Sequence, residues 1–416
     1  MNKRLFIDAY HSIKNIIKKT PLEYNERLSK KYGCNLYIKR EDLQLCRSFK
    51  IRGALHKIVN LSSYEKENGI VCASAGNHAQ GVALSAKKFN ISADIFVPST
   101  TPLQKINRIK NQSDENKCKL HITGNNFNDS LEDALEFKKK YNKVFIHPYN
   151  DYDVVLGQST IAHEICTELK NDNKKPDIMI SSIGGGGLIS GLSEYTKEFS
   201  ECLHIGVEPK SCPSMRESFL RNKLLKIIPK DNFVDGATVS KVGDITFRIC
   251  KNNVDRYYDV SLGKICETMI DLYQEDGIIS EPAGALPISM LDQLDSDEIK
   301  NKNVVCILSG GNNDITRYPE ILDRCLRYQG KKLYYIVRFV QRPGELKTFV
   351  NNILSEGDDI VRFEYIKKTN KDFGNVLVGI ELEQSINKFK VESNLLKYDV
   401  NYIEINENDQ LYSYLV

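Results

Sequence analysis

One lysine has neighbours that favour chemistry at its amine. Lys50 lies between Phe49 and Ile51 in the segment SFKIRGA, and an apolar stripe at nearly helical spacing continues to Ile58. An amine held in an apolar setting has a lowered pKa and can attack an aldehyde. A lone lysine is more often a solvated surface charge, so this segment indicates a nucleophile only in combination with other signals.

A run of four glycines is the second signal. The run at 184–187 lies between an apolar strand candidate and a helix candidate that begins with LISGL. Glycines let backbone N–H groups approach a ligand, and a helix N-terminus adds donors and a favourable dipole, so the run suits a phosphate. It matches neither GxxxxGK[ST] nor GxGxxG, so a nucleoside triphosphate is not indicated. A flexible turn is the alternative interpretation.

Two further segments place polar groups where strand candidates end. SAGNHAQG at 74–81 follows an apolar run, so its N–H groups could hold an anion, and Asn77 offers both a donor and an acceptor. LSGGNND at 308–314 ends another run, where a hydroxyl could pair with a ring nitrogen. We interpret His78 as a structural histidine rather than a general base.

Strands and helices must bring these segments together. Apolar runs at 70–73, 93–97, 144–146, 177–183 and 303–308 predict strands, and the stretches between them contain amphipathic helices. This alternation predicts right-handed crossovers and a mostly parallel sheet. Ligands of such sheets gather at the carboxyl ends of the strands, which is where the segments above lie.

The pattern changes near Tyr328. The order that follows, strand, helix, strand, strand, helix, strand, is that of the ferredoxin-like fold. We therefore expect a catalytic region at 1–325 with a smaller subdomain at about 53–150, a linker at 326–331 and a small α+β domain at 332–416.

Composition excludes several classes of protein. The 58 basic and 55 acidic side chains give a net charge of +3, which is no footprint for nucleic acid. No stretch approaches the ~20 apolar residues of a membrane span, and the first residues lack the apolar core of a secretory signal. Eleven cysteines without a CxxC pair are typical of reduced thiols. We expect a cytoplasmic protein that binds neither nucleic acid nor membranes.

Six motifs in this order resemble one known family. SFKIRGA, SAGNHAQG, SIGGGGL, GVEP, EPAGA and LSGGN are similar to motifs of the fold-type II pyridoxal-phosphate enzymes, the tryptophan synthase β-like family. Within it the chain is most similar to the threonine dehydratases, and RPGEL at 342–346 resembles part of the ACT-like regulatory domain of the biosynthetic form. The resemblance implies an α/β catalytic part with two open, twisted, mostly parallel sheets, followed by a ferredoxin-like ACT-like domain.

The resemblance also implies a role for each motif residue. Lys50 would bond covalently to pyridoxal 5'-phosphate and act as the general base. Phe49 would pack against the pyridine ring, Asn77 would hydrogen-bond its 3′ oxygen, and Ser309 would face its nitrogen. The phosphate would be held by Gly184, Gly185, Gly186, Gly187 and Leu188. The substrate carboxylate would lie against Ser74, Ala75, Gly76 and His78. The role of Glu281 in EPAGA stays open.

The implied reaction is β-elimination, which converts L-threonine to 2-oxobutanoate and ammonia as the first step of isoleucine biosynthesis. A neutral hydroxyl such as Ser309 does not hold the pyridine nitrogen protonated, which favours prompt loss of the leaving group. Family members that bind a divalent cation have an acidic group six residues after the glutamate of GVEP. Here Ser214 follows Glu208 at that offset, so we expect no metal.

Several alternatives stay open. A serine/threonine dehydratase of broad specificity and a serine racemase share these motifs, although the ACT-like part favours a regulated threonine enzyme. A non-catalytic amino-acid sensor is more distant, because Lys50, Asn77 and Ser309 are all present. The ACT-like part would bind isoleucine or valine, or would only build an interface. Such domains pair side by side, so we expect a homo-oligomer, either a dimer or a tetramer.

Overall fold

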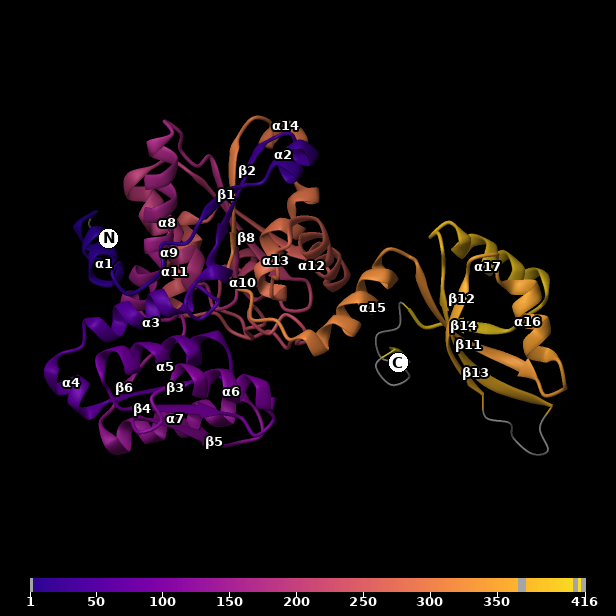
Figure 1. Ribbon diagram of the computed structural model, residues 1–416, viewed down its shortest axis with the longest axis horizontal. Coiled ribbons are helices and arrows are strands. Elements are labelled where there is room, and N and C mark those ends of the chain that lie inside the picture. Colours follow the sequence, from indigo (N-terminus) through magenta and orange to yellow (C-terminus); the bar gives the residue numbers. More distant parts are fainter. Residues whose placement is uncertain (1–2, 366–371, 407–410, 413–416) are drawn as a thin grey trace. The chain divides into compact units, whose positions relative to one another are not determined.

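The structure is a computed structural model that describes residues 3–365, 372–406 and 411–412. The chain forms two compact units, Met1–Asp314 and Ile315–Val416 (Figure 1). No helix in the described ranges is both long enough and apolar enough to cross a membrane. Each unit is described by itself below.

The first unit is built on a six-stranded sheet. All its neighbouring strands are parallel except the first pair, which is antiparallel. In spatial order the strands are β1 (Leu22–Tyr24), β2 (Asn35–Arg40), β10 (Asn303–Leu308), β7 (Ile178–Ser182), β8 (Leu203–Pro209) and β9 (Arg256–Val260). Strand β10 is the last of them in sequence but lies in the middle of the sheet, so it joins the two halves.

Helices cover both faces of this sheet. Side chains of β10 alternate between the faces: Val305 and Ile307 pack with α1, α8 and α9, whereas the neighbouring Cys306 lies on the face of α13. The helices of this part are α1 (Lys3–Ile13), α2 (Glu26–Tyr32), η1 (Glu41–Leu43), α8 (Tyr152–Asn171), α9 (Gly187–Phe199), α10 (Ser214–Leu220), α11 (Asp244–Asn253), α12 (Leu262–Asp276), α13 (Pro282–Ser289), η2 (Leu291–Gln293) and α14 (Ser296–Ile299).

A second, four-stranded parallel sheet completes this unit. Its spatial order is β5 (Cys118–Ile122), β4 (Ala93–Val97), β3 (Ile70–Ala73) and β6 (Val144–Phe145). One face packs on α5 and the other on α7, because alternate residues of β3 point to opposite sides. The accompanying helices are α3 (Lys50–Val59), α4 (Ser63–Asn68), α5 (Asn77–Phe89), α6 (Leu103–Gln112) and α7 (Phe127–Tyr141). The prediction of two open, mostly parallel sheets is confirmed.

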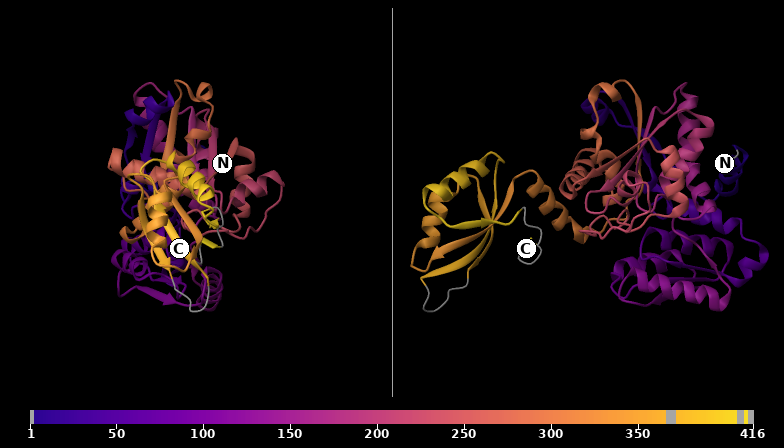
Figure 2. Two further views of the ribbon diagram at one scale, coloured as in Figure 1. Left: turned by 90° about the vertical axis from the view of Figure 1, so that its right-hand side faces the viewer. Right: turned by 180° about the vertical axis from the view of Figure 1, so that it is seen from behind.

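The second unit has the ferredoxin-like order that the sequence predicts. Its four strands form an antiparallel sheet, and helices α16 (Glu345–Ile353) and α17 (Asn387–Lys397) cover one face of that sheet (Figure 2). In chain order the elements are η3 (Ile315–Arg317), α15 (Tyr318–Tyr328), β11 (Lys332–Val340), α16 (Glu345–Ile353), β12 (Asp359–Tyr365), β13 (Phe373–Glu381), α17 (Asn387–Lys397) and β14 (Tyr402–Glu404). Helix α15 continues through the first three residues of the predicted linker at 326–331, because Ile321 and Cys325 give it a buried face.

Candidate active site

Lys50 is the first residue of α3, and its position is fixed by the end of β10. The N–H of Phe49 donates to the carbonyl of Ser309 at 3.0 Å, and Ser48 forms an antiparallel bridge with Gly310. The Lys50 ammonium donates to the carbonyl of Pro148 at 3.1 Å. Burial lowers the pKa of Lys50 to about 8, although the charge of Glu281 opposes this shift. The structure therefore provides a lysine amine that is partly unprotonated at neutral pH.

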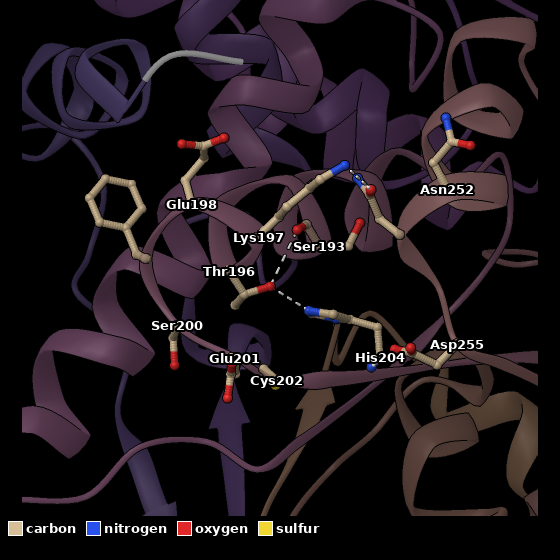
Figure 3. A pocket seen from close by; sticks show the side chains of 12 residues that line it. Ser193, Thr196, Lys197, Glu198, Ser200, Glu201, Cys202, His204, Asn252 and Asp255 are labelled. Carbon is tan, nitrogen blue, oxygen red and sulfur yellow. Dashed lines mark hydrogen bonds between the residues drawn. The ribbon is translucent and has the colours of Figure 1, made fainter.

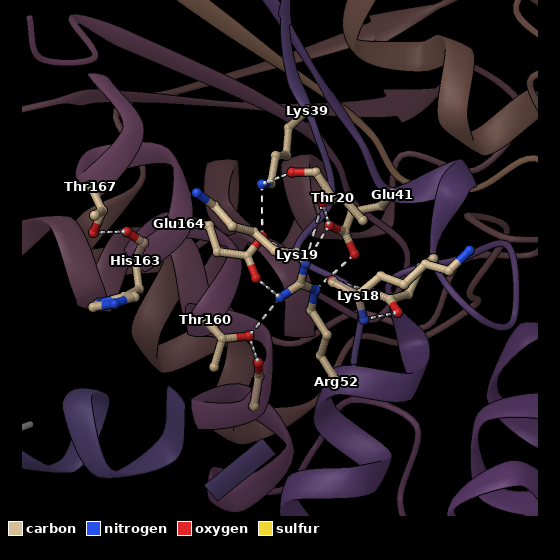
Figure 4. A network of polar contacts seen from close by, with 12 residues as sticks. Lys18, Lys19, Thr20, Lys39, Glu41, Arg52, Thr160, His163, Glu164 and Thr167 are labelled. Carbon is tan, nitrogen blue, oxygen red and sulfur yellow. Dashed lines mark hydrogen bonds and ion pairs between the residues drawn. The ribbon is translucent and has the colours of Figure 1, made fainter. Parts of the chain in front are cut away.

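A buried network of charges holds the helix that begins at Lys50. Figure 4 shows the guanidinium of Arg52 between the carboxylates of Glu41 and Glu164. The Lys39 ammonium lies 2.7 Å from the same Glu164 carboxylate. These charged groups are almost completely shielded from solvent and come from β2, η1, α3 and α8. No local motif pairs them, which is why sequence reasoning missed the network.

The glycine run forms a cradle with little or no room for side chains. Gly186 has a φ of +92°, in the left-handed region that favours glycine. A Cβ on Gly185 would lie 2.2 Å from the Tyr149 ring, so a side chain is excluded there. Thr246 donates its hydroxyl proton to the carbonyl of Gly185 at 2.6 Å and so fixes the loop. The run leads into the 13-residue helix α9, whose first N–H groups have no partner within the helix.

This geometry fits a phosphate group. Gly184 and Gly187 also lie close to neighbouring segments. A Cβ added to Gly184 would lie 3.1 Å from Gly236, and one added to Gly187 would lie 3.0 Å from Tyr149. Backbone N–H donors without side chains above them can contact an anion directly. Leu188 buries its side chain in the core between α1, α8 and α9, so only its backbone is available to a ligand.

The hydroxyl of Ser309 lies buried at the carboxyl end of β10. Ser182, at the end of the neighbouring β7, donates to the Ser309 oxygen at 3.4 Å. A hydroxyl that accepts one hydrogen bond still has its own proton to donate, which a ring nitrogen could accept. Phe49 is half-buried, and its ring centroid lies 5.2 Å from the Lys50 ammonium. The structure thus brings Lys50, Phe49 and Ser309 into one site.

Asn77 begins helix α5 and contacts a carboxylate from far along the chain. Its Nδ2 donates to Glu281 at 2.8 and 3.0 Å, and its Oδ1 accepts from Asn312 at 2.8 Å. Burial raises the pKa of the Glu281 carboxyl to about 7, although the bond from Asn77 opposes this shift. Sequence reasoning left Glu281 without a role and missed Asn312, although Asn312 lies inside the LSGGNND segment.

The loop predicted to hold the substrate carboxylate is half-buried and leads into α5. The N–H of Gly76 donates to the Ser74 hydroxyl at 3.2 Å, and Ala75 is also half-buried. The ring of His78 bonds instead to the carbonyl of Ile146 at 2.8 Å. Burial, helped by the charge of Lys50, lowers the pKa of His78 to about 3, so the ring is neutral. His78 can therefore contribute to an anion site only through its backbone.

Glu208 lies buried at the end of β8, where its carboxylate accepts the N–H groups of Met215 and Arg216 at 2.8 Å each. These two residues are near the start of α10, so Glu208 caps that helix. Burial raises its pKa to about 8. Within the described ranges, no cluster of three or more His, Cys, Asp or Glu side chains has a geometry suited to a metal ion.

A separate cavity of about 530 Å³ lies beside the C-terminal end of α9 and contains none of the predicted site residues. Figure 3 shows Thr196 and His204 within it, and their side chains hydrogen-bond at 2.6 Å. His204 is near the start of β8, whereas Glu208 and the glycine run are at the carboxyl ends of strands. This cavity therefore lies at the amino-terminal ends of the strands, whereas the candidate active site lies at their carboxyl ends.

Comparisons with known proteins identify the family of the chain. Residues 13–310 match the model of the pyridoxal-phosphate dependent enzyme family, and residues 323–415 match that of the C-terminal regulatory domain of threonine dehydratase. The chain is 47% identical over 411 residues to the L-threonine dehydratase biosynthetic IlvA of Staphylococcus aureus (strain NCTC 8325 / PS 47), which covers 98% of this chain and 97% of that protein. The corresponding protein of Staphylococcus epidermidis (strain ATCC 12228 / FDA PCI 1200) gives the same values.

Solved structures are also similar. The processed form of threonine deaminase isoform 2 from Solanum lycopersicum has a TM-score of 0.71 and 34% identity, and covers 78% of this chain and 94% of its own. Serine racemase from Dictyostelium discoideum has a TM-score of 0.70 and 28% identity, and covers 76% and 99%. The chain therefore belongs to the pyridoxal-phosphate dependent enzymes and, within them, to the biosynthetic threonine dehydratases.

Proposed function

We propose that this protein is a threonine ammonia-lyase that uses pyridoxal 5'-phosphate to convert L-threonine to 2-oxobutanoate and ammonia. The observation that carries the proposal is the position of Lys50, a half-buried amine with a pKa of about 8. Lys50 begins helix α3, and the backbone N–H of the residue before it, Phe49, donates to the carbonyl of Ser309. The similarity to biosynthetic threonine dehydratases over nearly the whole chain supports the same activity.

The residues of the site fit the three parts of the cofactor. The N–H groups of the glycine run and of the start of α9 would hold the phosphate, Asn77 would donate to the 3′ oxygen, and Ser309 would donate to the ring nitrogen. When bound, pyridoxal 5'-phosphate supplies an aldehyde that bonds to amines and a ring that accepts negative charge from Cα. Lys50 is the amine that would hold it before the substrate arrives.

Lys50 also has the properties of the general base. Once the substrate amine has replaced it, the free Lys50 amine is the group that would take the proton from Cα of threonine. The half-buried loop at 74–76 would orient the substrate through its carboxylate. The β-hydroxyl then leaves with a proton as water. The released enamine takes up a proton at carbon and is hydrolysed, which yields 2-oxobutanoate and ammonia.

L-Serine is a second candidate substrate. The observation that favours it is the similarity to serine racemase from Dictyostelium discoideum, whose TM-score nearly equals that of the tomato threonine deaminase. A serine/threonine dehydratase of broad specificity would also fit the site, because the same groups bind the parts that threonine and serine share.

The second unit supports feedback regulation. It matches the regulatory domain of threonine dehydratase, and we infer that it binds an end-product amino acid, isoleucine or valine. We further infer that the protein is a cytoplasmic homo-oligomer, either a dimer or a tetramer. Threonine saturation curves with and without each amino acid test the regulation, and sedimentation tests the assembly. Curves that neither amino acid changes would remove the regulatory inference.

Release of 2-oxobutanoate from L-threonine by the purified protein tests the reaction, with Lys50→Ala in parallel. We expect release by the wild type, loss of release in the variant, and a yellow colour in the wild type alone. Lys57→Ala is a matched control, since Lys57 is on the same helix and pairs with Asp151 and Asp153 instead. A yellow wild type that releases no 2-oxobutanoate would keep the cofactor and shift the assignment to serine chemistry.

A further inference from the structure

The side chain of Asn77 is held at both ends by groups from distant parts of the chain. Asn312 donates one Nδ2 hydrogen bond to the Oδ1 of Asn77 and another to the carbonyl of Cys46, both at 2.8 Å. The Nδ2 of Asn77 donates to the Glu281 carboxylate, which also accepts the backbone N–H of Asn312. Asn77, Glu281 and Asn312 therefore form a closed ring of hydrogen bonds.

This ring allows one orientation of the Asn77 amide. The two ends of an amide have nearly the same shape, so their orientation must follow from their partners. The carbonyl of Cys46 is a fixed backbone acceptor, so the end of Asn312 that faces it must be the NH2 group. The second hydrogen of that group then points to Asn77, which must present its oxygen. The nitrogen of Asn77 is left to face Glu281.

A count of hydrogens shows what this orientation provides. The Nδ2 of Asn77 has two hydrogens. It lies at nearly equal distances from the two Glu281 oxygens, which is the geometry expected when one hydrogen is shared between both oxygens. The second hydrogen remains to be donated. In the reversed orientation, an oxygen would face the Glu281 carboxylate, and no donor would be left for an anionic ligand atom.

We propose that Asn312 is a positioning residue that acts through Asn77 and sets it as a hydrogen-bond donor toward the 3′ oxygen of the bound cofactor. This inference rests on the proposed function, because it requires that the cofactor bind beside Asn77. The role differs from that of Ser309 in the same segment, which would contact the cofactor itself.

A double-mutant cycle on cofactor affinity tests the proposal. Cofactor-free wild type, Asn312→Ala, Asn77→Ala and the double variant are titrated with pyridoxal 5'-phosphate, and the visible absorbance is followed. Loss of one hydrogen bond to a charged group corresponds to binding that is weaker by about ten- to a hundredfold, so we expect an effect in that range for each single variant. Because Asn312 acts through Asn77, we expect the double variant to bind as Asn77→Ala does. Single effects that multiply in the double variant would overturn the proposal.

Two further variants complete the test. Asn35→Ala removes a similar asparagine pair, 3.2 Å from Asn303, at the opposite end of β2 and β10, and we expect it to leave cofactor affinity unchanged. Asn312→Ser keeps a polar side chain that is too short for both partners, and it replaces the alanine variant if that variant does not fold. We expect it to weaken binding similarly and to shift the absorbance spectrum of the bound cofactor. If wild type binds no cofactor, the proposed function fails; if Asn312→Ala and Asn312→Ser bind as wild type does, only this inference fails.

Discussion

Glu164 neutralises two buried cations at once, so its removal should cost far more than the loss of an exposed ion pair. In Glu164→Ala, Arg52 keeps its two bonds to Glu41 at 2.7 and 2.8 Å. Among the described residues, Lys39 keeps only the carbonyl of Thr20 at 2.6 Å and the partly exposed Glu168 at 3.4 Å. The variant therefore leaves the buried Lys39 ammonium with one carboxylate, which is more distant and partly exposed.

The expected cost follows from this imbalance. Removal of one partner from a buried ion pair destabilises a protein by about 3–5 kcal/mol. At about 2.1 cal/mol/K per residue, the 314-residue unit unfolds with an entropy on the order of 0.7 kcal/mol/K, so its midpoint should fall by roughly 4–8 °C. The assay is thermal unfolding of the cofactor-free protein, because bound cofactor would itself raise the midpoint.

Two comparisons show whether the reasoning holds. Glu26→Gln removes an exposed pair with Lys30 on α2, and we expect no measurable change in midpoint. The double variant Lys39→Met, Glu164→Met removes one cation and one anion together, and we expect it to recover most of the lost stability. If Glu164→Ala melts at the wild-type temperature, or if the double variant is less stable than the single one, the charge argument is wrong.

Three further outcomes are expected. Gly185→Ala should abolish cofactor binding while the cofactor-free protein still folds, since the new methyl would lie 2.2 Å from the Tyr149 ring; titration with the cofactor checks this. Capture of the cofactor by the cofactor-free protein should accelerate with pH up to about 8 and then level off, because only the unprotonated Lys50 amine attacks an aldehyde; a rate independent of pH would contradict it. The pKa of Glu208 is raised from 4.5 to about 8 by burial. The folded state therefore keeps a proton that the unfolded state loses, and stability from this group should fall as pH rises between those values; urea unfolding of Glu208→Gln should show a flatter pH dependence.

Much of the fold could be predicted because its strands are apolar. The runs at 70–73, 93–97 and 303–308 are confirmed as β3, β4 and β10. Strand β2 was missed, because its NLYIKR sequence contains Lys39 and Arg40, which read as exposed charges. The carboxylate that pairs most closely with Lys39 is on α8, far away in the sequence. Nothing near β2 in the sequence therefore indicates that Lys39 is buried.

The candidate site also contains residues that the sequence could identify and residues that it could not. Lys50, Asn77, the glycine run and Ser309 could be singled out because each lies in a compact motif, and their roles stay predictions. Asn312 acts on a side chain 235 positions earlier, so its importance depends on a distance that no local pattern records. Glu281 could be quoted from EPAGA, but its contact with Asn77 appears only once α5 and α13 are placed.

The position of β10 has a consequence for how the protein is made. Its residues are the last of the sheet to leave the ribosome, yet they pair with β2 on one side and β7 on the other. Until residue 308 has been synthesised, β2 and β7 each have an open edge, and open edges of parallel sheets are slow to pair and prone to aggregate. The same residues bring Ser309 to Phe49, so a nascent chain that ends before β10 has the lysine but lacks the site around it. Ribosome stalling or truncation within that stretch should therefore leave a chain that neither captures the cofactor nor stays in solution.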